Sequence, residues 1–361
     1  MIGTQDPAEV SRFMQAYAKR YSAGAFAMPT AKDLAAHPER VRWWPGAVAV
    51  ETVLRRHSRR HDFTGAPYVL PAGSSVITHI AREEGAEVPD LRNFDYVTAY
   101  VEDEALTESL IAAGRVRVAT RISASAELIA VWAHPGFGRE LDPVDDVDLA
   151  RFPDPAPTAA MREKVLAEVD AIDGWLDDFP LYSDGSWDAV SLRGYRPDDP
   201  SWGVKPAEMP EKWHADHPGC RDLRCDWTTL SARTPNLRAL IEAVRWWGTF
   251  DRVRLMRMRG RPDRPARLAR HTDITDRSAG TRPGQMVRFF IPLVTDPSVE
   301  MTVWGLDGRP TVRHLEPWGL YYADIRKPHA VVNPSGRDRI QLAVDVIVDD
   351  VVRGRIGGTF P

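Results

Sequence analysis

The C-terminal part of the chain alternates short apolar segments with turn residues, and this pattern constrains the fold more than any other feature. The expected strands are 253–258, 268–274, 286–293, 301–304, 311–315, 319–324, 329–333 and 340–348. Leu306-Asp307-Gly308 is a hairpin turn signal between two of them. About eight short strands separated by turns predict a jelly roll or barrel.

A proline-rich stretch divides the chain into two expected domains. Phe152-Pro153-Asp154-Pro155-Ala156-Pro157 has alternate prolines, which fit neither a helix interior nor a central strand, so it predicts a linker. The 361 residues are enough for about two domains. We therefore expect an α/β N-terminal lobe over residues 1–151 and a β-rich domain with flanking helices over residues 158–361. Together they predict a fold of the α+β class.

Helical patterns occur on both sides of this linker. Pro7 to Tyr21 carries an apolar stripe at helical spacing. Thr234-Pro235 offers an N-cap and a proline for the first turn of another helix. Further helices are expected over 102–113 and 158–175, and N-terminal strands over 96–101, 115–120 and 127–132. The N-terminal lobe shows no catalytic set, so we expect it to cover the active site or to form a dimer.

Composition limits the classes of function. The net charge is −4 and the pI is near 6.2, without the basic surplus of a nucleic-acid-binding domain. No apolar run approaches the roughly 18 residues of a membrane-spanning helix, and no signal peptide is recognisable. Only Cys220 and Cys225 are present, so no disulfide framework is expected. We expect a cytoplasmic protein with a small-molecule substrate, and neither a membrane nor a nucleic acid as partner.

His271-Thr272-Asp273 is the clearest chemical signal. In the expected strand 268–274, positions i and i+2 point to the same face, so the imidazole and the carboxylate would converge inside the barrel. His329 begins a later strand and is the candidate third ligand. Two histidines and one carboxylate form the facial triad of non-haem iron(II) oxygenases, which leaves positions for a co-substrate and O₂. Zinc would also fit these ligands but would use them for hydrolysis.

Two arginines near the starts of expected strands fit an acidic co-substrate. Arg339 lies at the start of the strand after His329, where it can form a bidentate salt bridge with the far carboxylate of 2-oxoglutarate. Arg288, near the start of segment 286–293, can add a second positive contact. These two residues favour a metal site over a chance pairing of a histidine with an aspartate.

The motifs together resemble the aspartyl/asparaginyl β-hydroxylase family, and in particular its bacterial members that hydroxylate free proline. The resemblance spans residues 175–350 and is carried by His271-Thr-Asp273, Val287-Arg-Phe-Phe-Ile-Pro-Leu293, His329-Ala-Val-Val-Asn333 and Arg339-Ile-Gln-Leu-Ala-Val-Asp345. It implies a cupin-like double-stranded β-helix that uses Fe(II), 2-oxoglutarate and O₂. It implies metal ligation by His271, Asp273 and His329. By motif position it assigns 2-oxoglutarate binding to Arg339, with Arg288 as a helper.

The resemblance also implies an activity. The expected reaction is hydroxylation of a C–H bond of an amino acid or an amino-acid-derived metabolite, free or carrier-bound. Asp273 favours hydroxylation, because iron halogenases of this fold have a small residue there and bind chloride in its place. One alternative is a protein or RNA hydroxylase of the same fold. Another is a non-catalytic cupin-like protein that keeps a metal for its structure.

Other features compete with this interpretation. A zinc set can be drawn from His214, His217, Cys220 and Cys225. Its irregular spacing favours a loop near the active-site mouth. Residues 252–270 contain eight arginines and are expected to form a solvated face or to attract an anionic substrate. A helix over 50–61 would place His57 and His61 on one face, although the surrounding arginines favour a solvated basic helix over a metal site.

Overall fold

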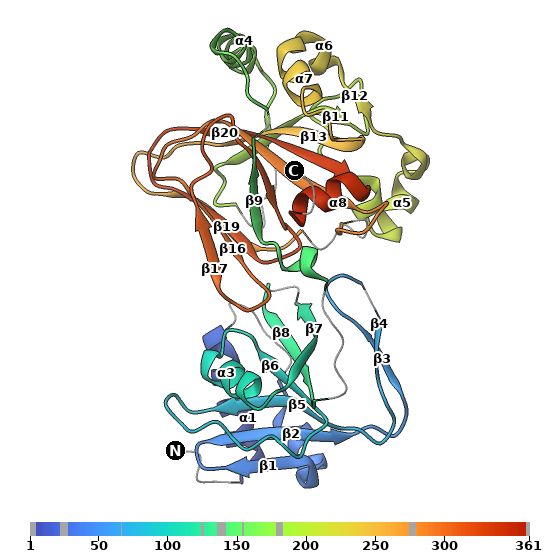
Figure 1. Cartoon of the computed structure of the whole chain (residues 1–361), viewed down its shortest axis with the longest axis vertical. Coiled ribbons are helices and arrows are strands. Elements are labelled where there is room, and N and C mark those ends of the chain that lie inside the picture. Colours follow the sequence, from blue (N-terminus) through green and yellow to red (C-terminus); the bar gives the residue numbers. More distant parts are fainter. Residues whose placement is uncertain are drawn as a thin grey trace. The chain divides into compact units, whose positions relative to one another are not determined.

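The computed structural model describes residues 5–21, 28–65, 67–123, 126–135, 142–153, 155–177, 183–273 and 279–358. The chain forms two compact units, and Figure 1 labels most of their helices and strands. The first comprises residues 1–142 together with Leu306–Arg309, and the second comprises residues 143–305 and 310–361. No helix in the described part of the chain has the length and apolar character needed to cross a membrane.

The first unit is built on a six-stranded sheet with strand order β1-β2-β5-β6-β8-β7. All neighbouring strands are antiparallel except β5 and β6, which are parallel. The strands are β1 (Val41–Trp44), β2 (Ala47–Val53), β5 (Ser75–Arg82), β6 (Tyr96–Tyr100), β7 (Val116–Ile122) and β8 (Leu128–Ala133). A separate hairpin pairs β3 (Ser58–His61) with β4 (Pro67–Leu70). The strands expected near β6, β7 and β8 are thus confirmed.

Helix α1 (Pro7–Tyr21) has the ends that its apolar stripe predicts. Its buried side chains Val10, Met14 and Tyr17 recur at helical spacing and share one core with Ile129 of the sheet. This unit also contains α2 (Ala31–Ala36) and α3 (Glu104–Ala112). The helix expected over 102–113 is α3, so the sequence patterns of this unit are confirmed for both long helices.

The helix expected over 50–61 is wrong. The segment instead contains the end of β2, which stops at Val53, and the start of β3 at Ser58. The β-branched residues Thr52 and Val53 lose side-chain freedom in a helix and fit a pleated strand. His57 therefore lies between two strands, and His57 and His61 do not share a helical face.

The second unit contains two sheets. The larger has eight strands in the order β10-β11-β13-β20-β15-β18-β9, with β12 pairing to β11, and the smaller has the order β14-β19-β16-β17. The larger sheet consists of β9 (Leu149–Phe152), β10 (Leu176–Asp177), β11 (Trp187–Gly194), β12 (Asp226–Trp227), β13 (Thr249–Met258), β15 (Met286–Val294), β18 (Leu320–Ala323) and β20 (Arg339–Ile347). The smaller consists of β14 (Ala266–His271), β16 (Glu300–Trp304), β17 (Pro310–Arg313) and β19 (His329–Asn333). Each strand expected between residues 253 and 348 is present.

Two apolar cores lie on opposite faces of the larger sheet. Along β20, Leu342 and Val344 belong to the core shared with helices, whereas Ala343 belongs to the core shared with the smaller sheet. The core between the sheets also includes Met301 of β16 and Val331 of β19. The side chains of β20 are buried on both faces, since alternate positions enter different cores. The helices of this unit are α4 (Ala159–Asp170), α5 (Glu211–Asp216), α6 (Thr229–Arg233), α7 (Pro235–Glu242) and α8 (Asp350–Ile356).

The second unit begins earlier than the proline-rich stretch suggests. The observed division falls after Asp142, whereas the sequence places it after residue 151. The reason is β9, which pairs with β18 through contacts such as Leu320 opposite Phe152. Strand pairing therefore includes residues 149–152 in the second unit. Within the expected linker, Asp154 lies outside the described residues.

Candidate metal centre

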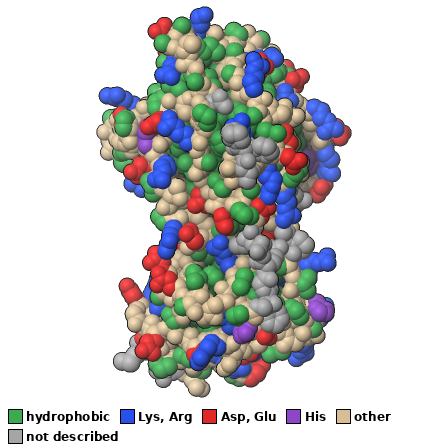
Figure 2. Space-filling view, viewed as in Figure 1, with side chains coloured by type: hydrophobic (Ala, Val, Ile, Leu, Met, Phe, Trp, Pro, Cys, Tyr) green, Lys and Arg blue, Asp and Glu red, His purple; other side chains and the backbone are tan. Residues whose placement is uncertain are grey.

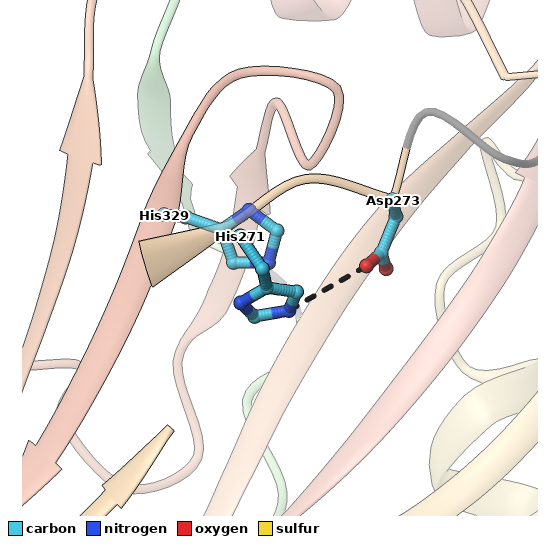
Figure 3. Close-up of side chains that lie close together, drawn as sticks. All are labelled: His271, Asp273 and His329. Atoms are coloured by element: carbon cyan, nitrogen blue, oxygen red, sulfur yellow. Dashed lines mark ion pairs between the residues drawn. The ribbon is translucent and has the colours of Figure 1, made fainter. Parts of the chain in front are cut away.

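The three expected ligands meet at the end of the smaller sheet. His271 is the last residue of β14, His329 is the first residue of β19, and the two stand opposite each other in the strand register. Figure 3 shows their rings beside Asp273. One ligand atom from each residue lies within 4.8 Å of the others, and His271 Nε2 is 3.6 Å from Asp273 Oδ1. One ion at about 2.1 Å from each of those two atoms would span the 3.6 Å gap.

Asp273 reaches the site by a different route from the one expected. Strand β14 ends at His271, so Asp273 lies beyond the strand and side-chain alternation does not orient it. Its backbone N–H instead donates to the carbonyl oxygen of Ile325 at 2.9 Å. The expected convergence of the three residues is observed, but a contact with another loop produces it.

Backbone carbonyls set the orientation of both imidazoles. His271 Nδ1 lies 2.7 Å from the carbonyl oxygen of Ala269, and His329 Nδ1 lies 3.0 Å from that of Lys327. A carbonyl only accepts, so each Nδ1 carries a proton, and in the neutral ring the lone pair is then on Nε2. Such a bond from the second ring nitrogen is the usual support of a metal-bound histidine. Both rings are therefore prepared to bind a cation through Nε2.

Burial keeps His329 neutral. The residue is 5% exposed, and burial together with the neighbouring His271 lowers the pKa of His329 to about 4. An imidazole of ordinary pKa would already be half protonated near pH 6.5. In the metal-free site the lone pair of His329 thus stays available at neutral pH.

Arg288 fixes one oxygen of Asp273. Its Nη1 donates to Asp273 Oδ2 at 2.5 Å, while its Nε and Nη2 donate to Asp345 at 2.6 and 3.1 Å. Burial works to raise the pKa of Asp273, but Arg288 and the two histidines outweigh it and leave that pKa below its usual value. Asp273 Oδ1, the oxygen nearer His271, is the one left for a metal.

Arg339 is a buried cation with no carboxylate partner among the described residues. It begins β20, is 2% exposed, and donates from Nη2 to Gln341 Oε1 at 2.5 Å. Its Nη1 has no hydrogen-bond acceptor among the described residues. Burial lowers the pKa of Arg339 to about 10, still far above neutral pH, so the side chain remains charged. A buried charge is costly unless it is paired, so this position is suited to an anionic ligand.

Trp187 is a site candidate that sequence reasoning missed. In the sheet register Trp187 stands opposite Met258, which in turn stands opposite Arg339. Trp187 and Met258 both belong to the core between the sheets, so the three side chains share one face. The buried Nε1 of Trp187 has no acceptor among the described residues. Two unpaired donors thus occupy one row of the larger sheet, and only its long-range register reveals them.

The basic segment 252–270 is not a single solvated face. Arg252 and Arg254 are buried, with 4% and 2% exposure. Arg257 instead pairs with Asp188 at 2.8 Å and stacks over Trp175. On the face drawn in Figure 2, basic and acidic side chains are interspersed. The expectation of a solvated arginine surface is therefore wrong for the buried part of this segment.

The alternative zinc set does not assemble. Among the described residues, the cluster that could hold a metal is His271, Asp273 and His329. His217 instead stacks on Trp213, with ring centroids 4.2 Å apart. Burial raises the pKa of the Cys225 thiol to about 12, which opposes the thiolate that zinc would need.

Comparisons with known proteins give structural likenesses at low identity. No family model and no curated protein matches the chain. A crystal structure of a Pseudomonas putida prolyl-4-hydroxylase is 14% identical with a TM-score of 0.32, covering 57% of this chain and 97% of that one. HygX from Streptomyces hygroscopicus, solved with nickel and 2-oxoglutarate bound, is 11% identical with a TM-score of 0.34, covering 57% and 85%. The non-heme alpha ketoglutarate dependent epimerase SnoN from nogalamycin biosynthesis is 13% identical with a TM-score of 0.34, covering 56% and 78%. Likenesses at these scores do not establish an activity, so the case for function stands on the geometry of the site.

Proposed function

We propose that this chain is an Fe(II)- and 2-oxoglutarate-dependent oxygenase that hydroxylates a C–H bond of an amino acid or an amino-acid-derived metabolite. The observation that carries the proposal is the combination of an open metal triad with a buried arginine that has no carboxylate partner among the described residues. The triad offers two imidazole nitrogens and one carboxylate oxygen. Arg339 offers a charge that no described carboxylate neutralises.

The donor set fits iron(II). Two neutral imidazoles and one carboxylate are borderline and hard ligands, and three protein ligands leave coordination positions for a chelating co-substrate and O₂. A structural zinc site would more often be closed by four protein ligands, frequently with cysteine. Both cysteines lie outside the described metal cluster. The donor set therefore supports a catalytic iron over a structural zinc.

The residues of the chain divide the work of binding. We assign the far carboxylate of 2-oxoglutarate to Arg339 and Trp187, whose free donors share one row of the sheet. We give Arg288 the role of positioning Asp273 instead of the co-substrate contact expected from the sequence. The reason is that Asp345 and Asp273 already accept its hydrogen bonds. The core between the sheets keeps water away from this end of the site. Bound Fe(II) would supply the activation of O₂.

The net reaction balances with these components alone. The substrate R–H, 2-oxoglutarate and O₂ give R–OH, succinate and CO₂, with one oxygen atom entering each of the alcohol and the succinate. Asp273 retains the carboxylate that a halogenase of this fold lacks, which supports hydroxyl transfer as the outcome. The protein's part is to orient the C–H bond and to hold both anions in place.

The wider architecture is part of the proposal. Two facing sheets and the strand order of the second unit support a double-stranded β-helix. The first unit, residues 1–142 with Leu306–Arg309, would then serve as a covering or dimerising lobe rather than as a second enzyme. A cytoplasmic location and a homodimer remain predictions from the sequence.

Two other functions fit the site less well. A non-catalytic metal-binding protein has no need of a buried arginine without a counter-ion, since that charge only costs stability. A protein or RNA hydroxylase using segment 252–270 would need those arginines at the surface, whereas Arg252 and Arg254 are buried. The small-molecule hydroxylase is therefore the better-supported function.

Substrate-stimulated turnover of 2-oxoglutarate tests the proposal. The full chain is loaded with Fe(II) without oxygen and then given O₂, 2-oxoglutarate and a panel of amino acids and their derivatives. Succinate formation that rises with one substrate class, together with a product heavier by one oxygen atom, is the expected result. Absence of both Fe(II) binding and 2-oxoglutarate turnover would reject the proposal.

A further inference from the structure

We propose that Asp145 and Asp148 are positioning residues for the metal ligands, acting through Arg326 and Lys327 on the loop Asp324–Pro328. This inference rests on the proposed function, because its object is the metal site. The two aspartates lie in the segment that opens the second unit, far in sequence from every ligand. Nothing in the ligand motifs themselves indicates a role for them.

The loop 324–328 holds two of the three ligands through its backbone. The carbonyl oxygen of Lys327 accepts from His329 Nδ1 at 3.0 Å. The carbonyl oxygen of Ile325 accepts from the backbone N–H of Asp273 at 2.9 Å. A displacement of this short loop would therefore turn the His329 ring and shift Asp273 together.

Arg326 fixes one side of the loop. The side chain is 3% exposed and lies against two carboxylates. Its Nη2 is 3.1 Å from Asp145 Oδ1 and 2.7 Å from Asp324 Oδ2, and its Nε is 2.8 Å from Asp324 Oδ1. Asp145 also accepts from the hydroxyl of Thr281 at 2.6 Å, so the partner of Arg326 is itself held from a second direction.

Lys327 fixes the other side. It is fully buried, at 0% exposure, and its Nζ lies 2.7 Å from Asp148 Oδ1 and 3.9 Å from Asp324 Oδ2. The backbone carbonyl of Asp148 also accepts from the N–H of Asp324 at 2.9 Å. Asp148 therefore contacts the loop twice, through its carboxylate to Lys327 and through its backbone carbonyl to Asp324.

Stability alone is a poor reason for this arrangement. Two consecutive buried cations and their carboxylates must be removed from water, and apolar residues of similar volume often stabilise a core as well or better. Charge-assisted hydrogen bonds, in contrast, impose a direction on the groups they join. The direction that matters here is that of two carbonyls, Ile325 and Lys327, each of which orients a metal ligand.

The second unit offers a matched control. Asp188 of β11 is also a buried carboxylate, 2% exposed, and pairs with Arg257 through bonds of 2.9 and 2.8 Å. Its neighbours Trp187 and Ala189 enter the core between the sheets, so Asp188 points to the opposite face. Asp188→Asn breaks a comparable ion pair without touching the loop that holds the ligands.

The test compares metal binding with stability in the full chain. Asp145→Asn, Asp148→Asn and Asp188→Asn are each prepared free of metal. Co(II) serves as the probe, and its affinity and its visible absorption spectrum are measured beside the urea midpoint of the metal-free protein. All three variants should lose stability. Only Asp145→Asn and Asp148→Asn should bind Co(II) about 10- to 100-fold more weakly, the usual effect of removing an outer support of a metal ligand, and only they should alter the Co(II) spectrum.

A double variant protects the test against misfolding. In Asp148→Asn, the buried ammonium of Lys327 loses its nearer carboxylate partner. Combining Asp148→Asn with Lys327→Met removes this poorly paired charge. If this variant regains stability but still binds Co(II) weakly, the positioning role is supported. Wild-type affinity and an unchanged spectrum in the Asp145 and Asp148 variants, or recovery of affinity together with stability in the double variant, would reject it. A wild-type protein that binds neither Co(II) nor Fe(II) would instead reject the proposed function and, with it, this inference.

Discussion

Arg339 and Asp345 lie on the same face of β20, but within the described part of the chain only Asp345 is neutralised by an opposite charge. Asp345 receives two hydrogen bonds from Arg288, whereas Arg339 has a neutral amide, Gln341, as its described partner. Alternate residues of a strand share a face, so both charged side chains lie on the side of β20 that faces the core between the sheets. Strand β20 thus carries a paired carboxylate near one end and, at the other, an arginine that no described carboxylate neutralises, so the Arg339 end is suited to an anionic ligand.

Replacing Arg339 should impair co-substrate binding without removing the metal. Arg339→Gln keeps a polar side chain but loses the charge, so the carboxylate of 2-oxoglutarate would enter the site unpaired. A cost of about 3 kcal/mol corresponds to roughly a 100-fold rise in the KM for 2-oxoglutarate. Initial rates at varied 2-oxoglutarate measure it, and Co(II) affinity serves as the control. An unchanged KM would remove Arg339 from the co-substrate site.

Trp187 should contribute a single hydrogen bond to the same carboxylate. Trp187→Phe removes the indole N–H and keeps an aromatic ring, so a loss of about 1.5–3 kcal/mol, or roughly 10- to 100-fold in 2-oxoglutarate affinity, is expected for a bond to a charged group. Trp247→Phe is the matched control, because Trp247 Nε1 is also buried without a described acceptor but belongs to the other core. Calorimetric titration with 2-oxoglutarate of the metal-loaded protein measures both. Equal affinities for the two variants would assign Trp187 to packing alone.

Loss of His329 should abolish metal binding. His329→Ala removes one of the three proposed protein ligands. Only His271 and Asp273 then remain, and two ligands do not complete a facial triad. Fe(II) content after anaerobic loading and gel filtration should fall to background, and succinate formation should stop. Iron retention and turnover at the wild-type level would show that the third ligand is a different residue.

Arg288 distinguishes positioning from co-substrate binding. Arg288→Lys keeps a positive charge but cannot bridge Asp273 and Asp345 with its planar fork, so Asp273 would lose its fixed orientation. We expect about 10- to 100-fold weaker metal binding or lower kcat, with little change in the KM for 2-oxoglutarate. A selective rise in that KM, with unchanged metal affinity, would restore the co-substrate contact that the sequence suggests.

The carboxylate of Asp273 should decide the product. In ¹⁸O₂ with chloride present, the wild-type protein should yield a product carrying one labelled oxygen, because on the proposed function Asp273 would occupy the position that chloride takes in a halogenase. Loss of two hydrogens would indicate desaturation, and a chlorinated product would contradict the assignment. Asp273→Gly should retain some iron through His271 and His329 and lose most hydroxylation. Full activity in that variant would mean that two histidines suffice.

The sequence predicted the site well where the chemistry is local. The strand pattern of residues 253–348, the clustering of the three expected ligands and the position of Arg339 at the start of β20 agree with what residue types and spacing predict. The convergence of His271 and Asp273 was expected from strand alternation. In the structure β14 ends at His271, and a bond to Ile325 orients Asp273 instead.

The remaining features depend on pairings between distant segments. Arg288 could be seen as a cation near the site, but its partner Asp345 is defined only by the register of β15 against β20. The same holds for Trp187, whose relation to Arg339 passes through Met258 of an intervening strand. The unit boundary was misplaced because a strand as short as β9 resembles a loop until β18 is seen to pair with it.

The register that sets His271 opposite His329 has a consequence for folding. Among the described residues, the two histidines come from segments separated by four intervening strands, β15, β16, β17 and β18. Contacts of such long sequence separation form late, because the chain must first close a large loop. A nascent or truncated chain that lacks β19 has no paired imidazoles to offer, so iron cannot guide its early collapse. Metal uptake would then mark the completion of folding, and a misfolded chain would be recognisable by its failure to retain the ion.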